Sequence, residues 1–350
     1  MRALVAPAPG HLSLAEVPAP VVGPSRVLVR SRVTAVSAGT ELRMLYQGRT
    51  PHGPDPAWPA VGAFGYLAAG DVIAVGPNAS DVHVGDRVTC GTTWGAHREV
   101  LDVDASFVQA LPAEVTYLDG ACAYWAVPPL CGILAGQPRF NDDVAVVGLG
   151  PLGLSAVQML VPFCRRVVAI DLIGSRCELA EHFGAIAIDG SRTDVTAALR
   201  RLLPDGPNVA IQAAGTQEAL ELALSIVAPR GVVANVGTLP PLTDFDLFWP
   251  MQVSGARLVP IHRPAGRDAA ELGTSLRQKY LPEVLDLMTR GRLDISSLCT
   301  WALPIELAPR AMPFLRDHPE SVLGLAFAWD EHDAFGVESF EAAVREAAST

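Results

Sequence analysis

The stretch VAVVGLGPLG, residues 144–153, decides the fold of this 350-residue chain. Its first four residues are all apolar, which is typical of a strand that is buried on both faces. Gly148, Gly150 and Gly153 follow with the spacing G-x-G-x-x-G. Glycines at this spacing permit a tight turn, the close approach of a pyrophosphate, and close contact between helix and strand. The stretch therefore predicts a strand, a turn and a helix that together bind a dinucleotide.

A second apolar run, Val167–Ile170, ends in Asp171. A carboxylate at this distance from the glycines accepts hydrogen bonds from the adenosine ribose hydroxyls. Asp171 would repel a 2′-phosphate, so we expect the protein to prefer NAD(H) over NADP(H). Arg176 leaves NADP(H) open, because its guanidinium can bind a hydroxyl or a phosphate. The predicted cofactor site comprises Gly148, Gly150, Pro151, Leu152, Gly153, Asp171, Arg176 and Gly237.

Short apolar runs alternate with helical stretches between residues 137 and 262, a pattern that predicts a parallel sheet with crossover helices. The runs are Val144–Val147, Val167–Ile170, Ala185–Ile188, Val209–Ile211, Val232–Val236 and Leu258–Ile261. The flanking segments, 1–136 and 263–350, are rich in short β-branched runs and turn residues. We therefore expect an α/β Rossmann domain over 137–262, inserted in a β-rich domain.

Composition narrows the class of function. The formal net charge of −11 disfavours a nucleic-acid partner, because an acidic surface repels phosphate backbones. The six cysteines form no C-x-x-C pair, and the first residues lack the apolar run of a signal peptide. The uncharged stretch Val144–Cys164 has the length of a membrane span, but its glycines and prolines favour a strand, a turn and a helix. We expect a cytoplasmic protein without a membrane partner.

Further motifs resemble the medium-chain dehydrogenase/reductase superfamily over residues 1–329. They are Ala38-Gly39-Thr40-Glu41, Gly65-x4-Gly70-x5-Gly76, Gly85-Asp86-Arg87-Val88 and the glycine turn. The resemblance implies a GroES-like β-barrel catalytic domain around the inserted Rossmann domain, with the active site in the cleft between them. It also implies a homodimer that pairs through the edge of the Rossmann sheet, here Leu258–Ile261.

The chain departs from the zinc-binding members of this family at their metal ligands. Ala38 stands where they carry cysteine, and Gly65-Tyr66-Leu67 stands where they carry Gly-His-Glu. The third ligand position falls near Tyr124 or Trp125, and only Cys90 lies where a structural-zinc lobe needs four cysteines. Zinc requires thiolate, imidazole or carboxylate ligands. We therefore expect no metal, as in a metal-free branch that includes proteins similar to bacteriochlorophyllide dehydrogenase.

Four residues are candidates for the catalytic work. Tyr66 occupies the histidine-ligand position, where its phenol would donate a hydrogen bond to the reacting oxygen. Thr40 matches the family's proton-relaying hydroxyl, Glu41 matches a family acid, and His262 ends the last Rossmann strand. The first three also have structural interpretations. Tyr66 can be a core tyrosine, Thr40 a turn-stabilising threonine and Glu41 an ion-paired glutamate. We expect a structural role for His97, and Tyr124 and Trp125 are expected to line the substrate pocket.

Three functions remain open from the residues and the resemblance. The first is a metal-independent, NAD(P)(H)-dependent oxidoreductase that interconverts an alcohol and a ketone or aldehyde on a small molecule, such as a secondary metabolite. The second is reduction of an activated C=C bond, as in metal-free quinone and enoyl reductases. The third is a nucleotide-binding sensor without turnover. The paired hydroxyls of Tyr66 and Thr40 favour the first, because they suit a reaction centred on oxygen.

Overall fold

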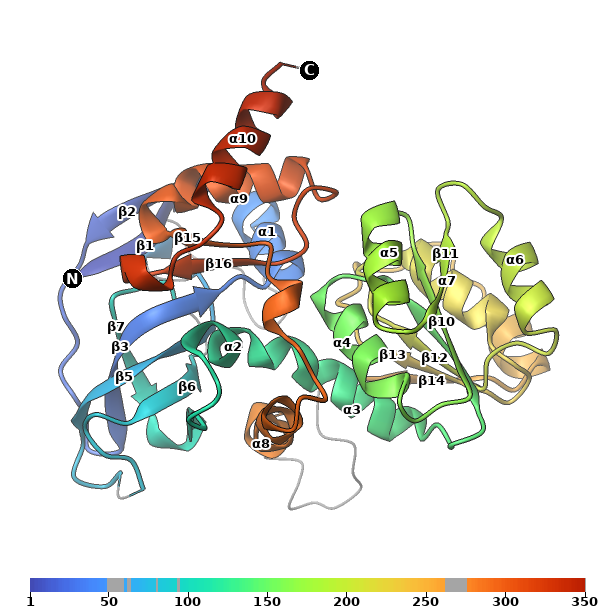
Figure 1. The fold of residues 1–350 in the computed structure, drawn as a ribbon, viewed down its shortest axis with the longest axis horizontal. Coiled ribbons are helices and arrows are strands. Elements are labelled where there is room, and N and C mark those ends of the chain that lie inside the picture. Colours follow the sequence, from blue (N-terminus) through green and yellow to red (C-terminus); the bar gives the residue numbers. More distant parts are fainter. Residues whose placement is uncertain (49–59, 62–63, 80, 93–94, 262–275, 350) are drawn as a thin grey trace. The chain divides into compact units, whose positions relative to one another are not determined.

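A computed structural model describes residues 1–48, 60–61, 64–79, 81–92, 95–261 and 276–349. The chain folds into two compact units (Figure 1). The first unit contains residues 1–124 and 295–350, and the second contains residues 125–294. The second unit is therefore an insertion in the first, in the order expected from the sequence.

The second unit is built on a six-stranded parallel sheet in the order β11-β10-β9-β12-β13-β14. This order corresponds to 3-2-1-4-5-6, the arrangement of a Rossmann fold. The strands are β9 (Asp143–Val147), β10 (Arg166–Asp171), β11 (Ile186–Asp189), β12 (Val209–Gln212), β13 (Val232–Asn235) and β14 (Arg257–Pro260). Every residue of β9 and β12 is buried, so these central strands are covered on both faces. Each strand lies within two residues of the apolar run that predicted it.

Helices flank this sheet in two groups (Figure 1). The helices are α3 (Val127–Gly136), α4 (Pro151–Leu160), α5 (Gly174–His182), α6 (Val195–Leu202), α7 (Gln217–Ile226) and α8 (Leu276–Thr289), and a π-helical turn, η3, spans Phe248–Val253. α3 contacts α4, which contacts α5, whereas α6 contacts α7. Leu199 of α6 and Leu220 of α7 form one core with alternate residues of the central strands, such as Ala145 and Val147. That alternation follows from the two-residue period of a strand.

The first unit contains a mainly antiparallel seven-stranded sheet and a three-stranded sheet. The seven strands are β3 (Arg26–Ala35), β5 (Leu67–Val75), β6 (Arg87–Gly91), β7 (Val100–Asp104), β8 (Val108–Ala110), β15 (Trp301–Pro304) and β16 (Leu325–Ala328). The smaller sheet contains β1 (Arg2–Ala8), β2 (His11–Glu16) and β4 (Ala60–Val61). Because β16 pairs with β3, the C-terminal segment completes the sheet begun by the N-terminal one.

Four α-helices of the first unit pack around these sheets. They are α1 (Ala38–Gln47), α2 (Tyr117–Cys122), α9 (Ala308–Asp317) and α10 (Val337–Ala347). Within the described part of the chain, 3-10 turns connect further elements: η1 (Ala105–Phe107), η2 (Ala123–Ala126), η5 (Ser296–Leu298), η6 (Ile305–Leu307) and η7 (Glu331–Asp333). Phe340 of α10 is fully buried against Trp301 and Phe314. The C-terminal helix therefore belongs to the core of this unit.

The inserted unit is wider than the domain expected over 137–262. α3 precedes that range, yet it packs on β12 and β13. A Cβ atom on Gly132 would lie 2.8 Å from Cγ2 of Val236, and one on Gly136 would lie 2.8 Å from Cγ1 of Val209. α8 follows the range and packs on α3. The packing of α3 on the sheet, and of α8 on α3, therefore brings both helices into this unit.

One helical run, Tyr117–Gly136, is long and apolar enough to cross a membrane by length and composition alone. Within its most apolar window, 56% is buried inside the protein, as in the core helix of a globular fold. The other uncharged stretch, Val144–Cys164, forms β9, the glycine turn and α4, as expected from its glycines and prolines.

Candidate active site

The glycine turn connects β9 to α4, and the backbone shows why glycine is needed there. Gly148 has a φ of +89°, and a Cβ on it would lie 2.7 Å from the nitrogen of Ala214. A Cβ on Gly153 would lie 1.8 Å from the carbonyl oxygen of Gly148. At Gly150, in contrast, a Cβ would meet no protein atom within 4 Å. The protein backbone therefore leaves no room for a side chain at Gly148 and Gly153, whereas the space beside Gly150 is open.

The first turn of α4 has no capping side chain, because Gly150 is its N-cap residue. Pro151 occupies the first helical position, where an N–H has no partner within the helix in any case. Leu152 and Gly153 follow in the same turn, where backbone N–H groups lack an acceptor within the helix. Such N–H groups, together with the positive end of the helix dipole, bind phosphate groups. The turn and the helix start thus fit the pyrophosphate of a dinucleotide.

Asp171 ends β10 beside this turn. Its Oδ2 accepts the N–H of Leu149 at 2.6 Å, and its Oδ1 accepts the N–H groups of Leu172 at 2.8 Å and Ile173 at 2.9 Å. A carboxylate has about four lone-pair sites, so one position remains for a ribose hydroxyl. Arg176 lies in the first turn of α5. Asp171 therefore orders the turn and is available to a ribose.

Polar side chains at the ends of three further strands escaped the sequence reasoning: Asp189, Gln212 and Asn235. Gln212 Oε1 and Asn235 Oδ1 are buried and have no hydrogen-bond partner among the described residues. Their amide nitrogens donate to the carbonyl groups of Ala214 at 2.7 Å and Gly237 at 3.1 Å. Buried polar atoms are rarely left unpaired, so two orphaned acceptors at this edge fit a ligand that donates hydrogen bonds. The available signal was a polar residue ending each apolar run.

Gly237, which the sequence places in the cofactor site, also permits a close contact between two loops. A Cβ at this position would lie 2.0 Å from the carbonyl oxygen of Ala214 and 2.9 Å from Gln212 Oε1. The loops that follow β12 and β13 therefore approach each other closely at this glycine.

Tyr66 and Ser37 meet because their strands pair. Ser37 follows β3, Tyr66 directly precedes β5, and Ala35 of β3 pairs with Leu67 of β5. The hydroxyl of Tyr66 donates a hydrogen bond to Ser37 Oγ at 2.7 Å. Tyr66 as a whole residue is partly exposed, although its hydroxyl group is buried among neighbouring side chains. Ser37 was not predicted from the sequence as a site residue, because its contact with the phenol depends on strand pairing.

The surroundings of Tyr66 keep its phenol neutral. Burial raises the pKa of Tyr66 well above its ordinary value, and nearby Tyr124 adds to the shift. Hydrogen bonds with the hydroxyls of Ser37 and Thr40 oppose the rise in this pKa without cancelling it. The Tyr124 ring meets the Tyr66 ring edge-on, with centroids 6.0 Å apart and planes at 88°. The cluster is thus a set of neutral hydroxyl groups that can donate and accept hydrogen bonds.

Glu41 and His97 form a buried pair beneath this cluster. Glu41 Oε2 lies 2.9 Å from His97 Nε2, and Glu41 Oε1 accepts the backbone N–H of Ser37 at 2.7 Å. His97 Nδ1 lies 2.8 Å from Thr34 Oγ1, which also accepts the indole N–H of Trp329 at 3.1 Å. An indole nitrogen only donates, so the Thr34 hydroxyl proton is best given to His97 Nδ1. His97 then carries its proton on Nε2 and donates it to Glu41 Oε2.

This arrangement supports the structural interpretations of Glu41 and His97. Both side chains are buried, and both oxygens of Glu41 already accept hydrogen bonds. Glu41 also lies in the first turn of α1, where the helix dipole favours a negative charge. His97 lies in a bend. A Cβ on Gly65 would lie 2.7 Å from the His97 ring, so the imidazole also fixes the turn that carries Tyr66.

The remaining expected site residues are distributed as follows. Thr40 is buried next to Tyr66, with which it shares a hydrogen bond. Tyr124 is partly exposed, whereas only 3% of Trp125 is exposed. Such burial leaves Trp125 little surface with which to line a pocket. His262 lies outside the described residues.

The donor set at the positions of the family's zinc ligands does not fit zinc. Ala38 offers a methyl group, Leu67 a buried isobutyl group, and Tyr66 a neutral phenol. Across the described parts of the chain, no three His, Cys, Asp or Glu side chains lie close enough together to hold a metal ion. We therefore derive no chemical step through a metal.

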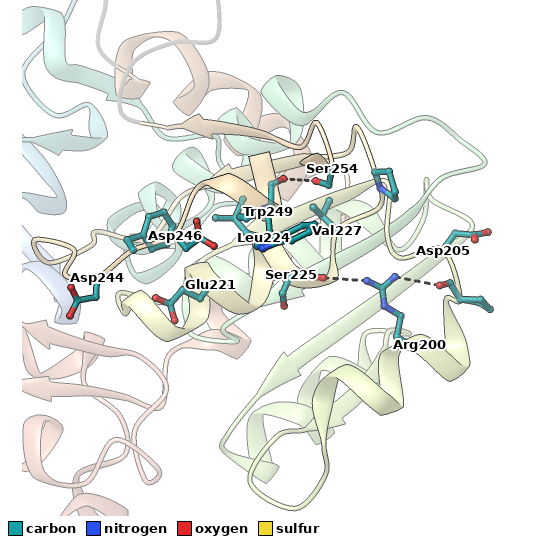
Figure 2. A pocket seen from close by; sticks show the side chains of 14 residues that line it. Arg200, Asp205, Glu221, Leu224, Ser225, Val227, Asp244, Asp246, Trp249 and Ser254 are labelled. Carbon is teal, nitrogen blue, oxygen red and sulfur yellow. Dashed lines mark hydrogen bonds between the residues drawn. The ribbon is translucent and has the colours of Figure 1, made fainter. Parts of the chain in front are cut away.

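A pocket of about 790 Å³ lies in the second unit, away from the glycine turn. It is lined by the ends of α6 and α7, including Arg200 and Leu224, and by Trp249 of η3. These helix ends precede β12 and β13, so the pocket lies toward the amino ends of the strands, whereas dinucleotides bind at the carboxyl ends. Figure 2 shows Arg200 donating to the carbonyl groups of Ser225 and Pro204 within this lining. The size of the pocket is therefore not a guide to the chemistry.

Comparisons with known proteins agree with this geometry. Residues 23–125 match the family described as alcohol dehydrogenase GroES-like domain, and residues 151–277 match the family described as zinc-binding dehydrogenase. D-guloside 3-dehydrogenase of Escherichia coli (strain K12) is 27% identical over 345 residues, which cover 91% of this chain and 97% of that protein.

Two solved structures show the same fold. Alcohol dehydrogenase TADH from Thermus sp. ATN1 has a TM-score of 0.77 and 26% identity, covering 94% of this chain and 99% of that one. Quinone oxidoreductase from Pseudomonas syringae pv. Tomato DC3000 has a TM-score of 0.76 and 21% identity, covering 93% of this chain and 99% of that one. The expected GroES-like domain with an inserted Rossmann domain is thus confirmed. The chain belongs to the medium-chain dehydrogenase/reductase superfamily of oxidoreductases.

Proposed function

We propose that this protein is a metal-independent, NAD(H)-dependent dehydrogenase/reductase that interconverts an alcohol and a ketone or aldehyde. The substrate is a small molecule, such as a secondary metabolite. The observation that carries the proposal is the Tyr66 phenol, which is hydrogen-bonded to Ser37 at the sequence position of a zinc-ligating histidine. A hydroxyl donor at this position polarises a carbonyl oxygen, which is the work that a metal does in zinc enzymes.

The second unit supplies the nucleotide site of this proposal. The open space at Gly150 and the uncapped start of α4 support binding of the pyrophosphate, and Asp171 supports binding of the ribose. A nicotinamide dinucleotide held by these residues would supply the hydride donor or acceptor for the reaction. The negative charge of Asp171 favours NAD(H) over NADP(H), because it repels a 2′-phosphate.

The hydroxyl cluster handles the proton at the substrate oxygen. During reduction, Tyr66 Oη donates a hydrogen bond to the carbonyl oxygen and then a proton to the nascent alkoxide. The raised pKa of Tyr66 keeps this proton in place until the alkoxide forms. In the structure the phenol donates to Ser37 Oγ. Reversal of that bond lets the Ser37 hydroxyl pass a proton to Tyr66 while Ser37, which is partly exposed, takes one from solvent. Thr40 is the second hydroxyl in reach.

Assays with two substrate panels test the proposed reaction. The purified protein is mixed with NADH and a panel of ketones and aldehydes, and separately with a panel of enones and quinones. Oxidation of NADH with carbonyl compounds and formation of the alcohol supports the proposal. Saturation of the C=C bond would assign the protein to the activated-alkene reductases instead. Tight binding of NADH without turnover on either panel would indicate a nucleotide sensor.

We also propose a cytoplasmic homodimer that pairs through the edge of the parallel sheet. β14 ends the sheet and pairs only with β13 among the described strands, and an unpaired edge favours addition of a partner strand. Phe248 is 54% exposed and Trp249 is 65% exposed on the neighbouring turn η3. Light scattering at micromolar concentration should give twice the chain mass, and Trp249→Ser should weaken the dimer. A monomeric native protein would contradict this proposal.

A further inference from the structure

A second carboxylate stands beside the ribose-binding Asp171. Asp189 ends β11, the strand next to β10, and it pairs in register with Asp171 in the parallel ladder. Neighbouring strands are about 4.8 Å apart, so both carboxylates belong to the same short segment of the sheet edge. A ligand group that contacts Asp171 therefore also lies within the electrostatic range of Asp189.

The two carboxylates differ in what they already bind. Asp171 accepts three backbone N–H groups, which it shares between both oxygens. Among the described residues, Asp189 forms hydrogen bonds only through Oδ1, which accepts the N–H of Ser191 at 2.9 Å and its hydroxyl at 2.6 Å. Its Oδ2 lies 3.4 Å from the point that a Cβ on Gly174 would occupy, at the start of α5. The free oxygen of Asp189 therefore faces the segment that follows Asp171.

The charge of Asp189 is present at neutral pH and is partly balanced. The hydrogen bonds from Ser191 hold the pKa of Asp189 below its ordinary value, and the nearby charge of Arg192 lowers it further. Arg176 lies in the first turn of α5, whose first residue, Gly174, is next to Asp189 Oδ2. Two carboxylates and the Arg192 guanidinium therefore contribute to the electrostatic field where a phosphate on the ribose would have to fit.

We propose that Asp189 is a second determinant of cofactor specificity, which disfavours the 2′-phosphate of NADP(H). This inference rests on the proposed function, because it requires that the second unit binds a nicotinamide dinucleotide. Asp189 adds a negative charge next to that of Asp171 and offsets the attraction of Arg192 for a phosphate. Loss of its charge leaves one carboxylate instead of two beside the ribose, which favours NADPH.

The hydrogen bonds make Asp189 a cleaner test of charge than Asp171. In Asp189→Asn, the amide oxygen still accepts both hydrogen bonds from Ser191, so the turn is retained. In Asp171→Asn, one oxygen becomes an NH2 group, which cannot accept the N–H of Leu149. That variant therefore disturbs the glycine turn and changes the binding of both cofactors, whatever their phosphate.

The experiment measures the dissociation constants of NADH and NADPH by fluorescence titration, in the native protein and in Asp189→Asn. A phosphate with about two charges, several ångströms from a removed carboxylate in water, should bind roughly three- to tenfold more tightly. NADH affinity should change less than about twofold. Raising the salt to 1 M should remove most of the gain, because the screening length falls to about 3 Å.

Two control variants separate charge from structure and position. Asp189→Glu keeps the charge and should keep the native ratio of NADPH to NADH affinity. Asp205→Asn removes one exposed aspartate from the opposite edge of the sheet and should also leave the ratio unchanged. An unchanged ratio in Asp189→Asn, or an equal gain in Asp205→Asn, would overturn the role of Asp189. A native protein that binds neither cofactor would overturn the proposed function itself.

Discussion

The glycine turn of the second unit and the Tyr66 cluster of the first are built in different ways. The turn is a backbone site, in which Gly148 and Gly153 are required because any side chain would strike the neighbouring backbone. The cluster is a side-chain site, in which Tyr66, Ser37 and Thr40 converge because two strands pair. A backbone site keeps its sequence signature, whereas a side-chain site can change its chemistry on the same scaffold. This explains how one chain keeps the family's nucleotide motif and lacks its zinc ligands.

The largest expected effect breaks the backbone site. Gly153→Ala places a Cβ 1.8 Å from the Gly148 carbonyl oxygen, so the turn must deform. We expect loss of measurable NADH binding and a lower unfolding temperature, since overpacking typically costs about 1–3 kcal/mol or more. Gly150→Ala is the matched control, because its Cβ meets no protein atom. It should weaken NADH binding while the unfolding temperature stays near that of the native protein.

The buried pair beneath the side-chain site should matter for stability. Glu41→Ala leaves His97 Nε2 and the Ser37 N–H without an acceptor in the interior. Leaving a buried donor without its acceptor in this way typically costs about 1–3 kcal/mol for each group. Urea denaturation should show this loss in the free energy of unfolding. Glu41→Gln retains a carbonyl oxygen and should cost less, and a loss below about 1 kcal/mol in Glu41→Ala would show that the pair is unimportant.

The hydroxyl cluster should matter for turnover and little for cofactor binding. Tyr66→Phe removes one oxyanion donor, which typically lowers kcat on the order of 10²–10³-fold. Ser37→Ala and Thr40→Val should also lower kcat, and each should add less than its own factor to the effect of Tyr66→Phe. NADH affinity should stay near the native value. Near-normal kcat with a lower unfolding temperature would make Tyr66 a core residue and move the assignment to His262.

The smallest expected effect concerns the pH dependence of turnover. The kcat of reduction should not fall in the ordinary alkaline range. The pKa of Tyr66 is raised by burial, so the protonated phenol persists above pH 10, the ordinary tyrosine value. Reduction by NADH needs this proton, so its kcat should not fall through loss of the Tyr66 proton until the pH exceeds 10. A decline centred below pH 9 in the native protein, absent from Tyr66→Phe, would contradict the raised pKa.

The contrast between the two sites also decides what the sequence could predict. The strands of the parallel sheet were predicted within two residues, because runs such as Val144–Val147 are buried on both faces and carry a simple signal. α1 was not predicted, although Ser37 precedes it and Glu41 lies in its first turn. Because Ala38 was interpreted only as a missing zinc ligand, the helix that begins at this residue was not predicted.

Contacts between distant residues could not be read from the sequence. Ser37 and Tyr66 are 29 positions apart, and Glu41 and His97 are 56 apart, so only strand pairing and packing bring them together. Asp189 was overlooked for the same reason, since its importance comes from its register with Asp171 in the sheet. Local backbone motifs could therefore be predicted from the sequence, whereas side-chain contacts between distant residues could not.

The most direct test of the account is the zinc content of the active protein, measured together with its turnover. The account predicts that protein purified without added metal contains no stoichiometric zinc and keeps its full kcat after dialysis against a chelator. One zinc ion per chain, removed by the chelator with loss of turnover and restored with added zinc, would contradict the replacement of the metal by the Tyr66 cluster.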